Sequence, residues 1–275
     1  KRALDHHLDG AAVLGTILVA TEGVNGTISG RPRELDGCLE VLGGLLGGEP
    51  IPRKTAKAPF QPFHRMKVRV KREIVPLGVE GVDPRKRVGA YVSPEEWNSL
   101  IQRDDVTLID TRNRYECSVG TFKGAINPET RSFREFPEFV EATLDPERQP
   151  KVAMFCTGGI RCEKATSLLL EKGFKEVYHL QGGILEYLAR VLESRSMWEG
   201  ECFVFDDRVT VDHALRPGSF EMCHACRLPL GAEDRKSSYF EEGISCPHCY
   251  DSLTPAKRAR LEERNRQMKL AQARD

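Results

Sequence analysis

A predicted strand, a glycine loop and a predicted helix follow one another over residues 151–172, and this unit most constrains the fold. Residues 151–155 (KVAMF) form a short apolar run typical of a buried strand. Residues 163–172 are predicted to be helical, with Gly173 as the C′ residue. Further short strands are predicted at 106–110 (VTLID) and 177–180 (VYHL). Strands that alternate with helices at this spacing predict a parallel α/β sheet with helices on both faces.

The loop FCTGGIRC (155–162) is predicted to make one thiol reactive. Cys156 follows a strand, at the edge where open α/β sheets carry their ligands. Glycine accepts φ values that other residues resist, so backbone N–H groups of the loop can turn toward an anion at the sulfur. The predicted anion cradle has four members: Thr157, Gly158, Gly159 and Ile160. The following helix N-terminus and Arg161 should lower the pKa of Cys156 further.

Four residues separate Cys156 from Arg161, and this spacing bears on the ligand. Thiol phosphatases use a longer spacing, because phosphate needs a wider ring of donors, so the shorter loop favours a smaller anion such as a persulfide sulfur. The alternative is a structural turn with two buried thiols, which the strand, the helix and the paired glycines disfavour. Cys162 is either a resolving thiol that attacks an oxidised Cys156 or a small packed residue.

Residues 88–192 resemble a rhodanese domain. The resemblance is carried by IDTRNRYECSVGTFKGAINP (109–128), the FCTGGIRC loop and VYHLQGGILEYL (177–188). It implies that Cys156 is the residue that becomes a persulfide nucleophile. Asp110, Arg112 and Glu116 match the D-x-R-x-x-x-E pattern of that family, and we interpret them as a structural ion-pair region.

Four longer stretches resemble the tRNA uridine hydroxylases: GTILVATEGVNGTISG (15–30), HRMKVRVKREIVPLG (64–78), FCTGGIRCEKAT (155–166) and WEGECFVFDDRV (198–209). The resemblance covers nearly the whole chain. It implies a cytoplasmic enzyme that 5-hydroxylates the wobble uridine of tRNA, with molecular oxygen as co-substrate and tRNA as partner. No organic cofactor is evident, since the sequence shows no P-loop, dinucleotide fingerprint, haem signature or Fe(II) triad.

Two C-x-x-C pairs near the end of the chain predict a structural zinc site. Nineteen residues separate them, which is within the range of a four-cysteine zinc ribbon. The predicted ligands are Cys223, Cys226, Cys246 and Cys249. Four thiolates leave no open position for substrate, so this zinc should be structural. Disulfides or metal-free thiols are the alternatives, and replacement of a thiolate by His224 or His248 is disfavoured.

Residues 1–83 are predicted to form a ferredoxin-like α+β domain that lacks its first strand. A helix is expected at 2–9, strands at 12–19 and 27–29, a second helix through the leucines of 35–46, and a strand at 66–71. This order matches a βαββαβ plan whose opening strand would lie upstream of Lys1.

The same region carries a basic segment, because residues 53–72 contain eight Lys or Arg residues and no acidic residue. Alternation over 66–71 places Lys67, Arg69 and Lys71 on one strand face, where they could follow RNA phosphates. An ordinary solvated strand face is the alternative. If the face binds tRNA, it should share one side of the molecule with Cys156, because a flipped base must reach the thiol.

Three regions are therefore expected: 1–83 as above, 84–195 as the rhodanese domain, and 196–275 as a cysteine-rich zinc-binding region with a basic helical tail. No apolar run approaches the ~20 residues of a membrane helix, so no membrane partner is expected. Six of the nine cysteines occur in the two C-x-x-C pairs and around the glycine loop, which favours a reducing cytoplasm, and Cys38, Cys117 and Cys202 are expected to be ordinary core or surface thiols. The sequence does not specify an oligomeric state.

Two rival functions make different predictions. A sulfurtransferase that carries a Cys156 persulfide predicts transferable sulfur and no oxygen dependence. A non-catalytic RNA- or protein-binding module predicts that substitution of Cys156 has no effect. For a hydroxylase, we expect the Cys156 thiolate to add to uracil C6, with Arg161 and the loop amides stabilising the anions.

Overall fold

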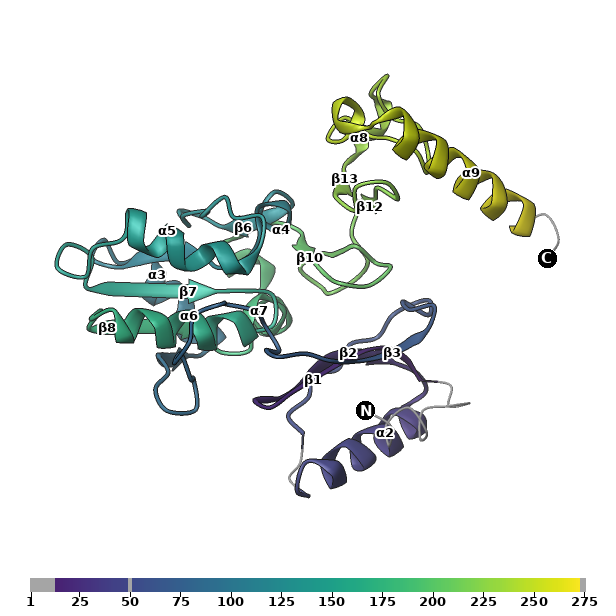
Figure 1. The fold of residues 1–275 in the computed structure, drawn as a ribbon. Coiled ribbons are helices and arrows are strands. Elements are labelled where there is room, and N and C mark those ends of the chain that lie inside the picture. Colours follow the sequence, from purple (N-terminus) through teal and green to yellow (C-terminus); the bar gives the residue numbers. More distant parts are fainter. Residues whose placement is uncertain (1–12, 49–50, 273–275) are drawn as a thin grey trace.

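Residues 13–48 and 51–272 are described by the computed structural model, in which a parallel sheet forms the centre of the middle region (Figure 1). In sheet order its strands are β4 (Ala90–Val92), β8 (Glu176–Leu180), β7 (Lys151–Phe155) and β5 (Thr107–Asp110). All neighbouring strands run parallel, which confirms the predicted parallel sheet. Strand β4 was not predicted, because three residues carry too little periodicity.

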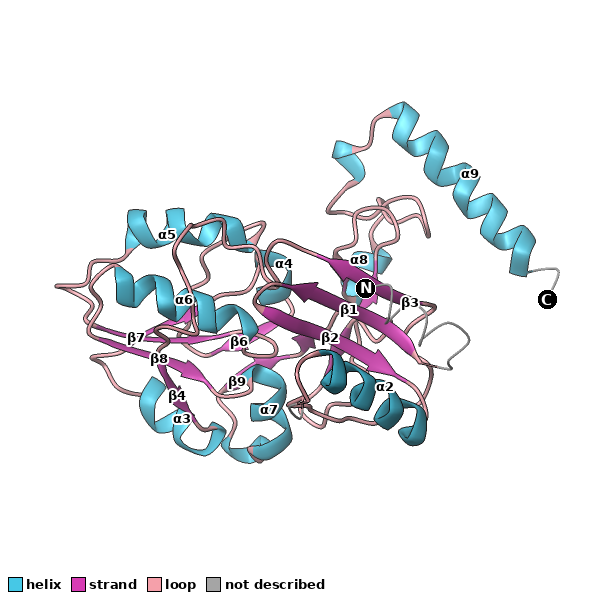
Figure 2. Ribbon diagram, turned by 60° about the horizontal axis from the view of Figure 1, so that its bottom comes forward, coloured by secondary structure: helices cyan, strands magenta, loops and turns pink. Residues whose placement is uncertain are grey.

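Helices cover both faces of this sheet (Figure 2). One face is covered by α5 (Phe136–Thr143) and α6 (Ile160–Glu171), the other by α3 (Pro94–Ile101) and α7 (Gly183–Arg190). The apolar run of β7 is fully buried because it has helices on both sides. Helix α3 begins as predicted, with the Ser93 hydroxyl accepting a hydrogen bond from the Glu96 N–H.

Shorter elements complete the middle region and join it to the third. They are α4 (Arg114–Cys117), β6 (Gly120–Phe122), β9 (Trp198–Gly200) and two 3-10 turns at Phe133–Glu135 and Glu193–Arg195. Strands β6 and β9 pair antiparallel, with Phe122 opposite Trp198. Both rings are buried, so this pairing anchors the start of the third region on the middle one.

The N-terminal region has the predicted order of two strands, a helix and a strand. Its elements are β1 (Leu14–Ala20), β2 (Gly23–Ser29), α2 (Pro32–Leu45) and β3 (Met66–Val70). The central strand β1 pairs antiparallel with β2 and parallel with β3. Ile17, Leu42 and Val68 are buried between the sheet and α2. The predicted helix over residues 2–9 lies outside the described residues.

The third region contains short strand pairs, a cysteine cluster and a long polar helix. Its elements are β10 (Cys202–Phe203), β11 (Thr210–Val211), β12 (Glu221–Met222), β13 (Pro229–Leu230), α8 (Ala232–Lys236), a 3-10 turn (Tyr250–Ser252) and α9 (Pro255–Gln272). Strand β10 pairs with β11, and β12 with β13. Helix α9 leads away from the rest of the chain, as its polar sequence allows (Figure 1).

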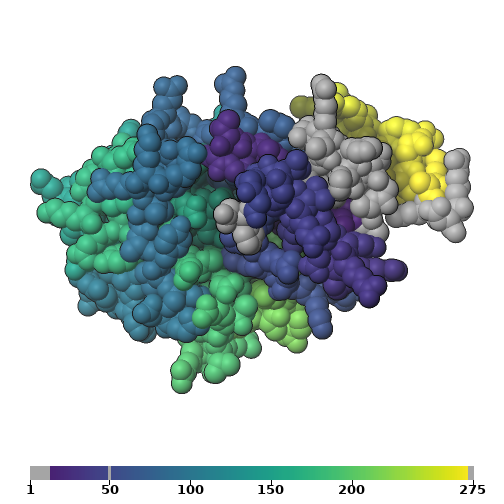
Figure 3. All heavy atoms as spheres, turned by 90° about the horizontal axis from the view of Figure 1, so that it is seen from below, coloured from purple at the N-terminus to yellow at the C-terminus, as the bar shows by residue number. Residues whose placement is uncertain are grey.

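The N-terminal and middle regions lie against one another (Figure 3). At their junction the buried Lys164 of α6 pairs with Glu22 at 2.9 Å and with Glu73 at 2.7 Å. Glu22 follows β1, and Glu73 lies in the connection that leaves β3. A buried ammonium needs such partners, so these two ion pairs tie the first region to the helix that follows Cys156.

Candidate functional site

Cys156 occupies the first position after β7 and is fully buried. Gly159, at the N-cap of α6, has a φ of 96° and donates its N–H to the Cys156 sulfur at 3.1 Å. Only glycine adopts this backbone conformation without strain. The loop thus directs a backbone donor at the sulfur, as expected of an anion cradle. The catalytic role of the loop itself stays a prediction.

The N-terminus of α7 supports the loop from behind. The Ile184 N–H donates to the Cys156 carbonyl at 3.0 Å, and the Leu185 N–H donates to the Thr157 carbonyl at 3.1 Å. A Cβ on Gly183 would lie only 2.4 Å from the Cys156 carbonyl oxygen, so this position requires glycine. The sequence placed these glycines at a helix start but gave no sign that the helix packs on the cysteine loop.

The surroundings of Cys156 favour its thiolate form. Burial acts against the charge, but a hydrogen bond from the Cys162 thiol, the positive charge of Arg161 and the backbone N–H groups of both residues outweigh it. The pKa of Cys156 is therefore lowered. A thiolate is the nucleophilic form of cysteine, so Cys156 has the electrostatic character of a reactive residue.

Cys162 has the opposite character. Burial, followed by the hydrogen bond and the charge of Cys156, raises the pKa of Cys162 well above its ordinary value. Its sulfur lies 3.6 Å from the Thr111 hydroxyl, and the residue is fully buried. The pair is thus one thiolate and one thiol, with Cys162 as the hydrogen-bond donor. The resolving role of Cys162 stays a proposal. A second role is that Cys162 stabilises the Cys156 thiolate.

Replacement of Cys162 by alanine should raise the pKa of Cys156, because the thiolate loses a donor. In a plot of reaction rate against pH, the fall of a thiolate-dependent rate at low pH should then begin at a higher pH. The measurement is an ultraviolet thiolate titration, taken as the difference between proteins with and without Cys156. Cys162→Ser, which keeps a donor, should recover part of the effect, and Cys38→Ala in the N-terminal region serves as control. An unchanged titration midpoint in Cys162→Ala would contradict the proposed donor role.

Arg161 does not point its donors at the sulfur. Its guanidinium makes a bidentate ion pair with Glu116 at 2.6 and 2.7 Å, and a further contact of 3.4 Å reaches the Thr157 hydroxyl. Both charged partners are buried. Arg161 therefore acts on Cys156 through its charge, while its N–H groups hold Glu116 and the loop. The spacing from Cys156 predicted that Arg161 lies at the loop, but no sequence signal indicated its partner.

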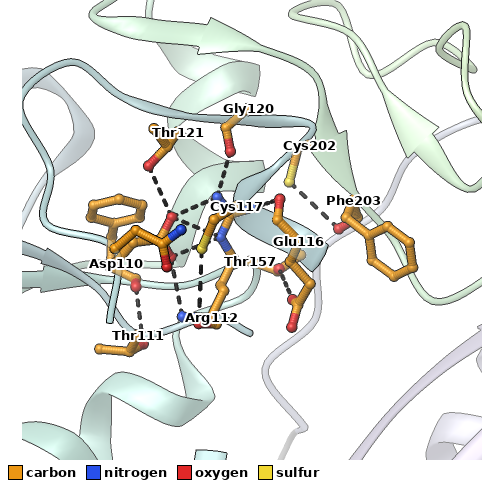
Figure 4. A network of polar contacts seen from close by, with 12 residues as sticks. Asp110, Thr111, Arg112, Glu116, Cys117, Gly120, Thr121, Thr157, Cys202 and Phe203 are labelled. Carbon is orange, nitrogen blue, oxygen red and sulfur yellow. Dashed lines mark hydrogen bonds and ion pairs between the residues drawn. The ribbon is translucent and has the colours of Figure 1, made fainter. Parts of the chain in front are cut away.

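A second buried ion pair joins Arg112 and Asp110 near Glu116 (Figure 4). Arg112 contacts Asp110 at 2.6 Å and donates to the carbonyls of Glu116 and Gly120. Its guanidinium also lies 5.1 Å from the centre of the Trp198 ring. Asp110 and Arg112 are both fully buried, so they hold the turn after β5 in place, as the structural interpretation of this motif requires.

Lys54 is a site residue that the sequence did not single out. It belongs to the basic segment between α2 and β3, yet its ammonium donates to the carbonyl of Gly158 at 3.0 Å and to that of Gly182. Both carbonyls belong to loops around Cys156. The segment carries no sequence signal for this contact, which depends on how the two regions pack.

A pocket of about 270 Å³ lies between the N-terminal region, the connection after β3 and the start of α6. Its lining includes Glu22, Tyr91, Ile160 and Glu163. The Tyr91 hydroxyl donates to Glu163 at 3.1 Å, and burial raises the pKa of Glu163. The pocket is next to the cysteine loop, because Ile160 is a member of the predicted anion cradle.

The predicted basic face lies on β3 and just after it. Arg69 and Lys71 are exposed, whereas Lys67 is half-buried. Within the described part of the chain, no carboxylate lies within 4.0 Å of their ammonium or guanidinium groups. The sheet that carries them lies toward the carboxyl end of β7, where Cys156 is found (Figure 1).

The four cysteines of the two C-x-x-C pairs come together in the third region. Their sulfur atoms all lie within 4.8 Å of one another, and Cys246 is 3.7 Å from both Cys226 and Cys249. The edges of a tetrahedral thiolate site are about 3.8 Å long, as the usual zinc–sulfur distance implies. The cluster could therefore hold a metal ion. His248 instead contacts Asp234 at 3.1 Å.

Two family models match two different parts of the chain. The family model of the UPF0176 acylphosphatase like domain matches residues 1–74, and that of the Rhodanese-like domain matches residues 93–190. A solved Rhodanese-like domain from Anabaena has a TM-score of 0.34 at 20% identity and covers 40% of this chain and 78% of that chain. Within the described residues, no helix is long and apolar enough to span a membrane.

Two curated relatives are similar over most of their length. A tRNA uridine(34) hydroxylase of Teredinibacter turnerae is 54% identical over 259 residues, which is 94% of this chain and 81% of that protein. A tRNA uridine(34) hydroxylase of Picosynechococcus is 55% identical over 268 residues, which is 96% of this chain and 90% of that protein.

Proposed function

The chain belongs to the tRNA uridine(34) hydroxylase family, and from this premise we propose that it hydroxylates C5 of the wobble uridine of tRNA with Cys156 as nucleophile. The observation that carries the role of Cys156 is its lowered pKa at the carboxyl end of β7, inside a loop that donates N–H groups to the sulfur. The tRNA substrate comes from the family, and the rhodanese domain supplies the loop.

The proposed first step is addition of the thiolate to uracil C6. The S–C6 bond forms, the C5=C6 π pair moves toward C4, and the negative charge develops on O4. The C5 carbon then has enolate character and is open to oxidation. After oxygen is installed at C5, loss of the C5 proton and cleavage of the S–C6 bond return the thiolate. The Gly159 N–H and the charge of Arg161 stabilise the sulfur anion before and after these steps.

We propose dioxygen as the oxidant and a cellular thiol as the reductant. The balanced reaction converts uridine, dioxygen and two thiols into 5-hydroxyuridine, water and one disulfide. Cys162 is proposed to act on an oxidised Cys156, because both thiols are buried beside the start of α6 and the Cys162 thiol contributes to the lowered pKa of Cys156.

The test is nucleoside mass spectrometry of tRNA after incubation with the purified full chain, in air and without oxygen. 5-Hydroxyuridine should form only in air. Formation at an equal rate without oxygen would exclude dioxygen as oxidant. Transfer of sulfur from thiosulfate without any hydroxylated nucleoside would favour the alternative sulfurtransferase with a Cys156 persulfide.

Binding of tRNA is assigned to Lys67, Arg69 and Lys71. In support, no carboxylate among the described residues pairs with them, and their sheet lies toward the carboxyl end of β7. We place the protein in the cytoplasm, where tRNA is found. In support of a reducing compartment, four of the cysteines come together as possible metal ligands and two more flank the glycine loop.

The cysteine cluster is proposed to bind zinc in a structural role, with four thiolates that hold together a region poor in apolar core. Cys223→Ser should lose the bound metal and lower the thermal stability of the third region. The neighbouring His224→Ala is the matched control and should keep both. The measurements are metal content by mass spectrometry of the native protein and thermal unfolding. Full metal content in Cys223→Ser would refute this ligand set.

A further inference from the structure

The cations around the Cys156 loop are almost all neutralised by carboxylates. Arg161 pairs with Glu116, Lys164 pairs with Glu22 and Glu73, and Arg190 pairs with Glu95 and Glu186. Over residues 13–48 and 51–272, Lys54 has no carboxylate within 4.0 Å. Its positive charge at the loop is therefore not held in a direct ion pair, although the Glu186 carboxylate acts on it from a longer distance.

Lys54 is held at the loop by backbone groups. Its ammonium donates to the carbonyls of Gly158 and Gly182, which lie in the loops after β7 and β8. A Cβ on Gly182 would lie 3.3 Å from the Lys54 Cε and 2.6 Å from the Glu186 Cβ, so glycine leaves room for the lysine to pass. An ammonium has three N–H donors, and these contacts use two of them. One donor remains for a substrate.

The charge of Lys54 also interacts with Cys156. Burial lowers the pKa of Lys54, while Glu186 and the Cys156 thiolate oppose this change. The Lys54 ammonium is bonded to Gly158, two residues after Cys156, and the charge of the Cys156 thiolate favours the charged form of Lys54. A group that adds to this sulfur will lie within the field of the same ammonium.

We propose that Lys54 is a catalytic residue that donates a hydrogen bond to uracil O4 when the Cys156 thiolate adds to C6. The proposal rests on the proposed function. In this step the S–C6 bond forms, the C5=C6 electron pair shifts, and O4 becomes an oxyanion. No atom leaves, and no oxidant or reductant takes part. From the sequence, Arg161 was expected to stabilise this oxyanion. Its N–H groups are instead hydrogen-bonded to Glu116 and Thr157, and Lys54 takes over the stabilisation.

The consequence for the architecture is that the active site is composite. The nucleophile comes from the middle region, and the cation that meets the developing oxyanion comes from the N-terminal region. Neither region carries both groups.

The test compares Lys54→Gln, Lys54→Arg and the wild-type chain on saturating tRNA. Lys54→Gln keeps much of the side-chain length but loses the charge, and should lower kcat by about 100-fold, the usual cost of losing one oxyanion donor. Affinity for tRNA and thermal stability should change little. Lys54→Arg should recover most of the loss, and the exposed Lys175→Ala, which lies just before β8, serves as control.

Three outcomes would count against the proposal. If the wild-type chain is active and Lys54→Gln has the same kcat, the proposed role of Lys54 is wrong, while the proposed hydroxylase function is unaffected. Weaker tRNA binding with an unchanged rate at saturation would overturn it too, and would assign Lys54 to a phosphate contact. A wild-type chain that forms no 5-hydroxyuridine would overturn the proposed function itself and the O4 contact with it.

Discussion

Replacement of Cys156 by serine should reduce the formation of 5-hydroxyuridine by at least about 10³-fold, because an alcohol supplies almost no anionic nucleophile at neutral pH. The loop that lowers the thiol pKa cannot compensate for the far weaker acidity of an alcohol. Serine is nearly isosteric, so the buried site should tolerate it without loss of the fold. The measurement is nucleoside mass spectrometry of tRNA, both with purified protein and from cells that carry the variant.

Cys38→Ser is the matched thiol control. Cys38 lies in the N-terminal core and should have no effect on hydroxylation. Cys162→Ala instead tests the resolving role: retained turnover, with only the altered pH dependence described above, would exclude that role. Wild-type activity in Cys156→Ser would exclude a covalent role for this sulfur and would favour a mechanism in which the rhodanese loop only binds the substrate.

Replacement of Glu116 by alanine should lower the free energy of unfolding by about 3–5 kcal/mol, the usual cost of leaving one member of a buried ion pair without its partner. Glu116 is fully buried and accepts both guanidinium bonds of Arg161. Its carboxylate also accepts the Asn113 N–H at 3.2 Å. Removal of the carboxylate would leave a buried guanidinium and a backbone donor without partners. Urea unfolding followed by circular dichroism gives the change.

The control for Glu116 is an exposed ion pair in the same region. Glu141 contacts Lys172 at 2.8 Å, but its side chain is 66% exposed. Glu141→Ala should therefore cost less than about 1 kcal/mol. A double replacement, Glu116→Leu with Arg161→Met, should be less harmful to stability than Glu116→Ala, because no buried charge is left behind. Equal losses for Glu116→Ala and Glu141→Ala would contradict this account.

Local signals in the sequence were sufficient for the elements around Cys156. The run KVAMF, the two glycines and Gly173 predicted the strand, the loop and the end of the helix, because each of these depends on neighbouring residues. The cysteine spacing likewise predicted that four sulfurs would meet. The strands β4 and β6 were missed, since three residues are too short for a periodic pattern.

The contacts of the site were harder to predict than its elements. Arg161 was placed at the loop by spacing, but its partner Glu116 lies 45 positions earlier in the chain. Lys54 lies 104 positions from the carbonyl of Gly158. Nothing in a single sequence states which distant residues will meet, so the electrostatics of the site depended on the packing of two regions.

The ion pairs of Lys164 with Glu22 and Glu73 limit how this protein can be divided. A fragment that starts at residue 84 would keep the cysteine loop but lose both acids and also Leu77, which packs in the same core cluster as α6, so this face of the helix would lose its ion pairs and its apolar cover. The same cut removes Lys54. Transfer of this rhodanese domain alone into another enzyme should therefore fail. The domain should work only together with the N-terminal region, so we expect the two regions to be inherited together.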